Sequence, residues 1–314
     1  MAKLDTCYAI IDAASEPDIF TMLEELDPPA SCLYSEPIQP EIAELAPYLV
    51  EATPEVRKWL SQRDTPWGIY VYTQATMREL RQHLRKYLMV MIPGQDKPVF
   101  WRYYDPRNVW DVLSTFDNWR LHTFLGPIKK LETQLWGEHE ESDFELERRR
   151  YPESVKQSGK LMKFSQTQYE RINKMFQTSF VKKLIVYFAT SSLNMEEDSD
   201  SFQNEKDILS KTLRNPKLCY EKEIRYFSEA RLLAAENMAW NLFDYCKLNR
   251  IDDEVSFQQL GYLLSMHQIK DFTAIPTEWL SDLDDDGSPG DYRVSSLLIK
   301  IFGFLPVFNK EVMK

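Results

Sequence analysis

The chain has 314 residues and a formal net charge of −11 at pH 7, and 43% of its residues are hydrophobic. This composition is that of a globular protein and excludes collagen-like and intrinsically disordered chains. The acidic balance argues against a nucleic-acid-binding protein, because neutralising phosphate groups requires a basic surface. Nine residues are glycine, and the sequence contains neither G-x-G nor a P-loop, so the glycine-rich loops that hold nucleotide phosphates are not expected.

The four histidines and four cysteines are scattered along the chain, with no H-E-x-x-H and no C-x-x-C spacing. We therefore expect no cofactor and no locally encoded zinc site, although a site assembled from distant residues stays open. The N-terminal residues do not read as a signal peptide, and no stretch reaches the 18 apolar residues that a membrane span needs. These features predict a cytoplasmic protein with reduced thiols and no membrane partner.

The first part of the chain alternates between predicted strands and helices. A helix that carries Ile19, Leu23 and Leu26 follows the first strand, and Pro28 ends it. Thr76 with Glu79 forms a capping-box pattern, which predicts the start of a second helix. A Pro93-Gly94 turn joins the last two predicted strands. The predicted strands cover residues 7–14, 31–34, 48–50, 67–73, 87–92 and 98–104.

The second part of the chain has helical periodicity only. Ser165 with Gln168, and Ser256 with Gln259, form capping-box patterns that predict two helix starts. Further helices are expected at about 221–248 and near 292–302.

We therefore predict an α+β protein, with an N-terminal α/β lobe that contains a small mixed sheet and an all-α C-terminal lobe. The predicted domain limits are 1–135 for the α/β lobe, 136–160 for a charged linker and 161–314 for the helical lobe.

Two aspartates and two arginines are the candidate site residues. Asp12 and Asp105 each lie beside an apolar strand-like run, where an unpaired charge is costly. Arg102 and Arg107 flank Asp105 in sequence. The favoured interpretation is an Asp–Arg pairing that ties strand ends together, and a catalytic pair of aspartates is the alternative.

The run Asp282–Gly287 matches the first half of an EF-hand calcium loop. The closing position, which should be a glutamate, is Arg293, and a cation there repels calcium. An acidic turn between helices is therefore favoured over a calcium site.

Several segments of the N-terminal part, in this order and spacing, resemble one protein family. It is the family of bacterial type VI secretion adaptor chaperones, whose shared domain was long catalogued as a domain of unknown function. The resemblance covers roughly residues 7–128 and does not extend into the back half of the chain. The segments are Tyr8–Ala14, Leu33–Tyr34, Ala46–Val50, Trp67–Gly68, Leu80–Arg85, Phe100–Arg107 and Phe124–Ile128.

The resemblance implies a non-enzymatic cytoplasmic adaptor chaperone that binds a secreted effector protein and promotes its loading onto the VgrG spike protein. On this basis Arg102, Asp105 and Arg107, together with Asp12, are expected to form a structural or partner-docking cluster, with the structural role favoured. No catalytic, cofactor-binding or metal-binding residue is expected. Two alternatives stay open, an immunity protein that neutralises a toxin and, less favoured, a carboxylate-dependent hydrolase that uses Asp12 and Asp105.

Overall fold

The structure is a computed structural model, and it describes residues 5–34, 37–135, 137–151, 161–191, 228–303 and 305. The chain divides into two compact units, Met1–Lys174 and Met175–Lys314. Helix α8 (Gln166–Ser191) belongs partly to each of them. The first unit combines sheets with helices, while the second has helices alone among its described residues, so the predicted α+β class is confirmed.

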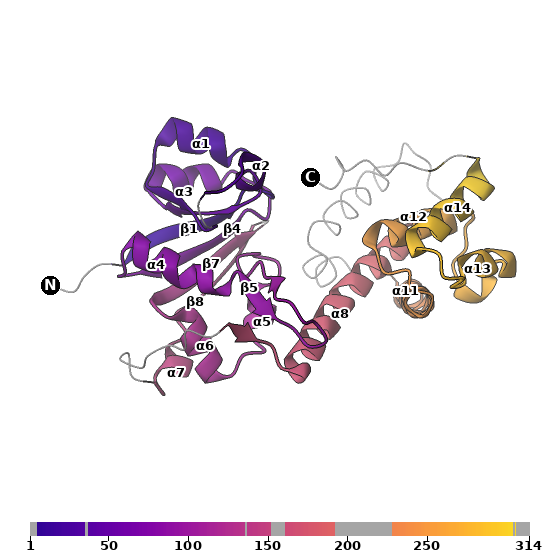
Figure 1. Cartoon of the computed structure of the whole chain (residues 1–314). Coiled ribbons are helices and arrows are strands. Elements are labelled where there is room, and N and C mark those ends of the chain that lie inside the picture. The colour runs from indigo at the N-terminus through magenta and orange to yellow at the C-terminus, as the bar shows by residue number, and fades with distance from the viewer. Residues whose placement is uncertain are drawn as a thin grey trace. The chain divides into compact units, whose positions relative to one another are not determined.

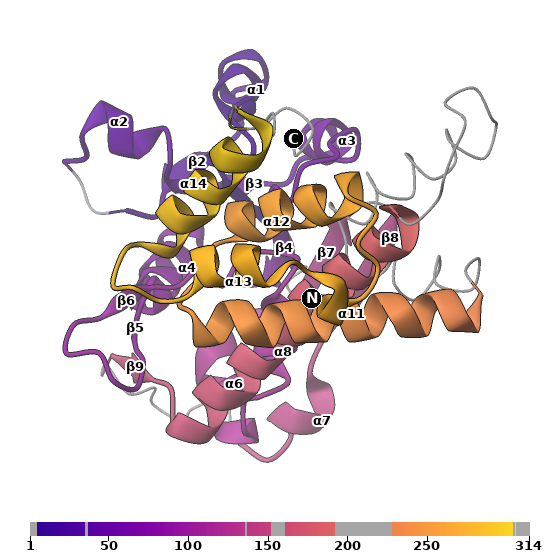
Figure 2. The same ribbon diagram turned by 90° about the vertical axis from the view of Figure 1, so that its right-hand side faces the viewer.

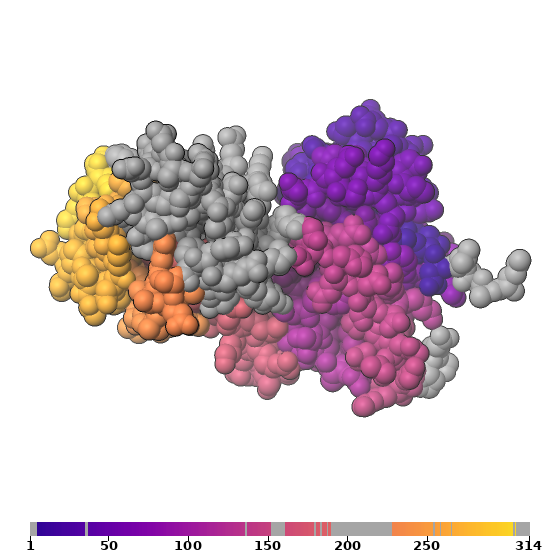
Figure 3. Space-filling model, turned by 180° about the vertical axis from the view of Figure 1, so that it is seen from behind, coloured from indigo at the N-terminus to yellow at the C-terminus, as the bar shows by residue number. Residues whose placement is uncertain are grey.

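A six-stranded antiparallel sheet forms the centre of the first unit, with strand order β2-β3-β1-β4-β7-β8. Its middle strands are apolar on both faces, which is why both faces are covered by other elements. Strand β4 pairs with β7, which follows it by more than fifty residues. Figure 3 shows the first unit as a surface, with early residues in indigo and purple beside later ones in magenta and pink. The strands are β1 (Thr6–Asp12), β2 (Ala30–Cys32), β3 (Pro47–Glu51), β4 (Gly68–Thr73), β7 (Ile128–Leu135) and β8 (Glu138–Ser142).

Alternation along the strands sends neighbouring residues to opposite faces of this sheet. Ala9 and Ile11 of β1 pack against α1 and α3, whereas Tyr8 and Ile10 belong to the core beneath α4 and α6. Figure 1 shows α1 and α3 together on one side of the sheet. The helices of this unit are α1 (Ile19–Leu26), α2 (Pro40–Ala43), α3 (Pro54–Leu60), α4 (Met77–Leu84), α5 (Val109–Leu113), α6 (Asn118–Leu125) and α7 (Glu145–Arg148), and η1 (Arg85–Tyr87) is a 3₁₀ turn.

A second sheet of three short strands has the order β6-β5-β9, with β5 antiparallel to β6 and parallel to β9. It packs a small core that includes Val90, Val112 and Phe164. The strand predicted over 98–104 is much shorter in the structure, because the chain turns after Phe100 and buries Tyr103 and Tyr104. The strands are β5 (Met89–Met91), β6 (Val99–Phe100) and β9 (Met162–Lys163).

The second unit packs its helices around one apolar core, which includes Leu184, Met238, Leu242, Leu263 and Leu297. Figure 2 shows α11 to α14 as the elements of this unit. The buried members of this core among the described residues run from Val181 to Leu298 and all belong to the second unit. Besides α8, the helices are α11 (Glu229–Leu248), α12 (Glu254–Met266), α13 (Thr277–Leu283) and α14 (Gly290–Phe302), and η3 (Phe272–Ala274) is a 3₁₀ turn.

Helix starts follow the capping patterns of the sequence with one exception. The capping box of Thr76 and Glu79 is present at α4, and Ser165 and Gln168 exchange the corresponding bonds at α8. The prediction that Ser256 caps a helix was wrong. Asp253 takes that role by accepting a bond from the Ser256 backbone N–H, and Ser256 is buried inside α12.

The sheet of the first lobe extends beyond residue 135, where the lobe was expected to end. The chain adds strands β7 and β8 to the main sheet, and β8 lies within the stretch 136–160 that was expected to be a charged linker. Most of β8 is exposed, since it is an edge strand. The predicted domain limits stay a prediction, because compact units in a structure do not establish independently folding domains. The predicted start of the helix at residue 221 lies outside the described residues.

Candidate functional site

The structure brings Asp12 and Arg102 together, although they are far apart in sequence. Asp12 is the last residue of β1, and its carboxylate is almost completely buried. Arg102 follows β6 and places its Nη1 3.3 Å from Asp12 Oδ2. The Ser15 hydroxyl donates to the same oxygen at 3.1 Å, and the Ala14 backbone N–H donates to Oδ1 at 3.3 Å. The pair therefore links the end of a main-sheet strand to the turn after the small sheet.

Asp105 and Arg107 form a separate local pair. Arg107 donates to both carboxylate oxygens of Asp105, from Nε at 2.9 Å and from Nη2 at 2.7 Å. The Arg107 backbone N–H and the Asn108 amide donate to the same carboxylate. Asp105 therefore organises the turn that leads into α5.

Several neighbouring groups act on the charge of Asp12. Burial raises the pKa of Asp12, and the positive charge of Arg102 and the bonds from Ser15 and Ala14 offset part of that rise. The negative charge of Asp105 raises the pKa of Asp12 further. Both arginine side chains remain about half exposed, so their outer faces can also meet a partner carboxylate. The geometry fits two ion pairs that stabilise the fold and whose arginine side chains also face solvent.

A second polar cluster, which the sequence did not indicate, surrounds the buried carboxylate of Glu132 on β7. Tyr72 donates its hydroxyl to Glu132 Oε2, while Arg57 and Gln134 donate to Oε1 at 3.2 and 2.7 Å. Arg57 comes from α3 and also donates to the Tyr72 oxygen at 2.8 Å and to Cys7 Sγ at 3.2 Å. Strands β1, β4 and β7 and helix α3 therefore meet at one polar centre.

The surroundings of Glu132 favour its charged form. Burial by itself raises the pKa of Glu132, but the Tyr72 hydroxyl, the charges of Arg57 and Lys130 and the Gln134 amide together hold it below the ordinary value. At Cys7 the net shift has the opposite sign, because burial outweighs the charge of Arg57 and raises the pKa of the thiol. The Cys7 thiol is therefore a poor nucleophile, because the thiolate is the reactive form.

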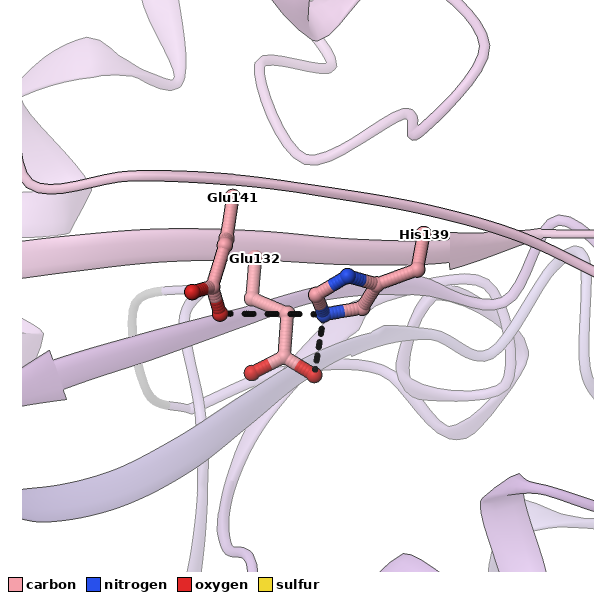
Figure 4. A group of neighbouring side chains, drawn as sticks. All are labelled: Glu132, His139 and Glu141. Carbon is pink, nitrogen blue, oxygen red and sulfur yellow. Dashed lines mark ion pairs between the residues drawn. The ribbon is translucent and has the colours of Figure 1, made fainter.

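Strand β8 adds His139 and Glu141 to this cluster (Figure 4). Glu141 lies directly opposite Glu132 in the β7–β8 register, and His139 is on the same face of β8 as Glu141. His139 Nε2 lies 3.4 Å from Glu132 Oε1 and 3.7 Å from Glu141 Oε2. Lys130 Nζ lies 2.8 Å from Glu141 Oε2. Glu132, His139 and Glu141 all have side chains that can bind a metal ion. Among the described residues, they form the one such group of three whose ligand atoms lie within 4.8 Å of one another.

Sequence reasoning missed this cluster because tertiary structure assembles it. Its members come from α3, β4, β7 and β8, and the strand pairing that joins them was not predicted at all. The available signal was weak. His139 and Glu141 have the alternate spacing that places side chains on one face of a strand, but they stand in a stretch that was interpreted as a linker.

Two other residues have structural roles. His83 is buried in α4, and its Nε2 lies 2.7 Å from the Phe124 carbonyl oxygen, as expected for a satisfied helix histidine. The buried Arg293 side chain donates to the carbonyl oxygen of Leu283, which lies within the acidic run 282–287, and to that of Asn249. The acidic run ends α13 and begins the connection to α14.

Residues 7–123 match the model of a protein family described as a domain of unknown function (DUF4123). This domain is known as an effector chaperone or adaptor domain of type VI secretion systems. The match over residues 7–123 confirms the resemblance drawn from the sequence segments. No curated protein and no solved structure matches the chain.

The matched stretch includes Asp12, Arg102, Asp105 and Arg107, but it ends before β7. Glu132, His139 and Glu141 therefore lie outside the matched domain, as does the helical unit. Within the described parts of the chain, no helix is both long enough and apolar enough to cross a membrane.

Proposed function

We propose that this chain is a non-enzymatic cytoplasmic adaptor chaperone, which binds a type VI secretion effector protein and promotes its loading onto the VgrG spike protein. The observation that carries the proposal is the adaptor domain over residues 7–123, which spans the main-sheet strands β1 to β4 and helices α1 to α5. Domains of this family are associated with effector adaptors. Protein partners are accordingly the binding partners we assign.

The site geometry supports a binding role over the hydrolase alternative. Asp105 is engaged by both donor groups of the Arg107 fork and by an amide. Asp12 is engaged by Arg102, Ser15 and a backbone N–H. A general base or nucleophile needs a lone pair directed at a substrate. Asp105 receives four such bonds and Asp12 three, so nearly all of their lone pairs are used to hold the chain.

The proposal is tested by co-purification and by secretion. The full chain, expressed with a type VI effector and a VgrG protein of the same organism, should retain its cognate effector through size-exclusion chromatography. Deleting the gene should abolish secretion of that effector and leave other type VI cargo unaffected, and the wild-type gene should restore it. Failure of both results would overturn the proposal.

The same deletion distinguishes an adaptor from an immunity protein. Loss of an adaptor disarms the cell without harming it, because the toxin is no longer delivered. Loss of an immunity protein makes the cell sensitive to its own siblings. Sensitivity to sister cells, measured in a competition assay with the parental strain, would therefore contradict the adaptor proposal.

A further inference from the structure

The β7–β8 pair presents three potential metal ligands on one face of the sheet. Glu132 and Glu141 are cross-strand neighbours, and His139 is displaced along β8 by one alternation of the strand (Figure 4). An imidazole nitrogen and two carboxylates form a donor set that suits zinc and related divalent metals. Catalytic zinc sites commonly use three protein ligands and leave a fourth position for water.

The spacing of the ligand atoms fits one metal ion. Zinc binds nitrogen and oxygen at about 2.0–2.2 Å, so two ligands of a tetrahedral ion are about 3.3–3.6 Å apart. His139 Nε2 lies 3.4 Å from Glu132 Oε1 and 3.7 Å from Glu141 Oε2. All three ligand atoms lie within 4.8 Å of one another. Small rotations of the two exposed side chains would therefore complete the geometry.

One ligand is fixed and the other two are accessible. Glu132 is buried and is held by bonds from Tyr72, Arg57 and Gln134. Of these donors, the Tyr72 hydroxyl bonds Oε2, the oxygen away from His139, and a partner that orients a ligating carboxylate in this way increases metal affinity. The side chains of His139 and Glu141 are 50% and 47% exposed, so an ion can reach them directly from solvent.

A cation already occupies the space between the two carboxylates. Lys130 Nζ lies 2.8 Å from Glu141 Oε2 and 3.9 Å from Glu132 Oε2. The ammonium group therefore marks a place where the local potential attracts positive charge, and it competes with a metal ion for Glu141. Arg57 and Gln134 donate to Glu132 Oε1, the oxygen nearest His139, so a metal ion bound there replaces one of these two donors, while Arg57 can keep its bonds to Tyr72 and Cys7.

We propose that Glu132, His139 and Glu141 form a binding site for a zinc-like divalent metal ion, which Lys130 occupies in its absence. A bound ion would tie the edge strand β8 to β7 through side chains in addition to the backbone ladder. The site lies outside the matched adaptor domain and does not depend on the proposed function.

The test is isothermal titration calorimetry, in which zinc chloride is titrated into the full chain without an affinity tag. We expect the wild type to bind one zinc ion per chain at this site. His139→Ala and Glu141→Gln should each weaken that binding at least tenfold, while Lys130→Gln should strengthen it because the competing ammonium is gone. His267→Ala is the matched control, since His267 is an exposed histidine of the other unit and its loss should leave the affinity unchanged.

Thermal unfolding provides a second measurement. Zinc at a hundred times its dissociation constant should raise the ratio of folded to unfolded wild-type chain about a hundredfold, and His139→Ala should abolish this effect. Circular dichroism checks that the variants fold. The proposal is overturned if zinc binds no better to the wild type than to His139→Ala. It is equally overturned if only Lys130→Gln binds zinc, because the natural chain then forms a lysine–carboxylate pair and no metal site.

Discussion

At the scale of single residues, burial has opposite consequences for two carboxylates of the same unit. Glu132 has three neutral or cationic donors at its oxygens, so its pKa is lowered. Asp12 has one half-exposed arginine and weaker bonds, so burial dominates and its pKa is raised. The number and the position of hydrogen-bond donors around a buried carboxylate decide how much free energy its charged form costs.

Glu132→Gln should lower the free energy of unfolding by about 2–4 kcal/mol at pH 7, because it removes a buried charged acceptor from a network of donors. A lowered folded-state pKa stabilises the fold above the unfolded value and loses that effect as pH falls through the folded value. The difference in unfolding free energy between wild type and variant should therefore be largest at pH 6–7 and shrink below pH 4.5.

Urea unfolding in the presence of EDTA measures this difference. Glu141→Gln is the control, because Glu141 is exposed and its loss should change the unfolding free energy by no more than about 0.5 kcal/mol. A pH-independent difference would contradict the assignment.

Arg102→Met should cost about 1 kcal/mol at pH 7, because the pair with Asp12 is half exposed on the arginine side. The pKa of Asp12 is higher in the folded chain than in the unfolded chain, where it is about 3.8. Protonation of Asp12 therefore stabilises the fold below pH 3.8, and this stabilisation is lost as the pH rises through the pKa of the folded chain. The variant removes the offsetting cation, so its cost should appear only where Asp12 is ionised.

The same variant separates the two roles of the candidate cluster. A structural role predicts an effector affinity within twofold of wild type, measured by titration of the purified proteins. A docking role predicts at least tenfold weaker binding by Arg102→Met or Arg107→Met in a chain that remains folded. We expect the structural result.

At the scale of elements, close backbone packing in the main sheet sets a requirement for glycine at one position. Gly68 begins β4 with φ +150°, and a Cβ atom there would lie 1.8 Å from the Ile10 carbonyl oxygen of β1. No side-chain rotation can relieve a contact between two backbones. The β1–β4 pairing at the centre of the sheet therefore depends on this residue.

Gly68→Ala should destabilise the first unit by at least about 3 kcal/mol, since either the strand pairing or the turn before β4 must shift. Gly94→Ala is the matched control. Gly94 also has a positive φ, +78°, but a Cβ atom there meets nothing within 4 Å, so we expect a cost of about 1 kcal/mol. Urea unfolding and the soluble yield measure the stability of both variants. An equal loss of unfolding free energy in Gly68→Ala and Gly94→Ala would refute the close-packing argument.

At the scale of the whole molecule, the two units have separate apolar cores. The cores of the first unit form around its sheets, and the core of the second is made by helices α8 and α11 to α14 with residues that follow them. Arg293 stabilises the second unit by donating to carbonyls at the C-terminal ends of α11 and α13. Its side chain is buried, and it satisfies groups that the helices themselves leave without partners.

Separate cores predict separate responses to mutation. Arg293→Met should raise amide hydrogen exchange in α11, α13 and α14, whereas Gly68→Ala should raise it in β1 and β4. Arg250→Met is a control for the second unit, because Arg250 pairs with Asp285 at the surface and its loss should have little effect. Hydrogen-exchange mass spectrometry of the full chain makes the measurement. Faster exchange across both units from either variant would show that they unfold as one.

The sequence by itself determined the α+β class, most strands of the main sheet, the capping of α4 and α8, and the family of the first part of the chain. These features depend on local patterns, namely alternation, helical spacing and short motifs in order. Only the tertiary structure placed β7 and β8 in the sheet, paired Asp12 with Arg102, and gathered Arg57, Tyr72, Glu132 and His139. Strand pairing and side-chain clusters join residues far apart in the chain, and a single sequence contains no local signal for such contacts.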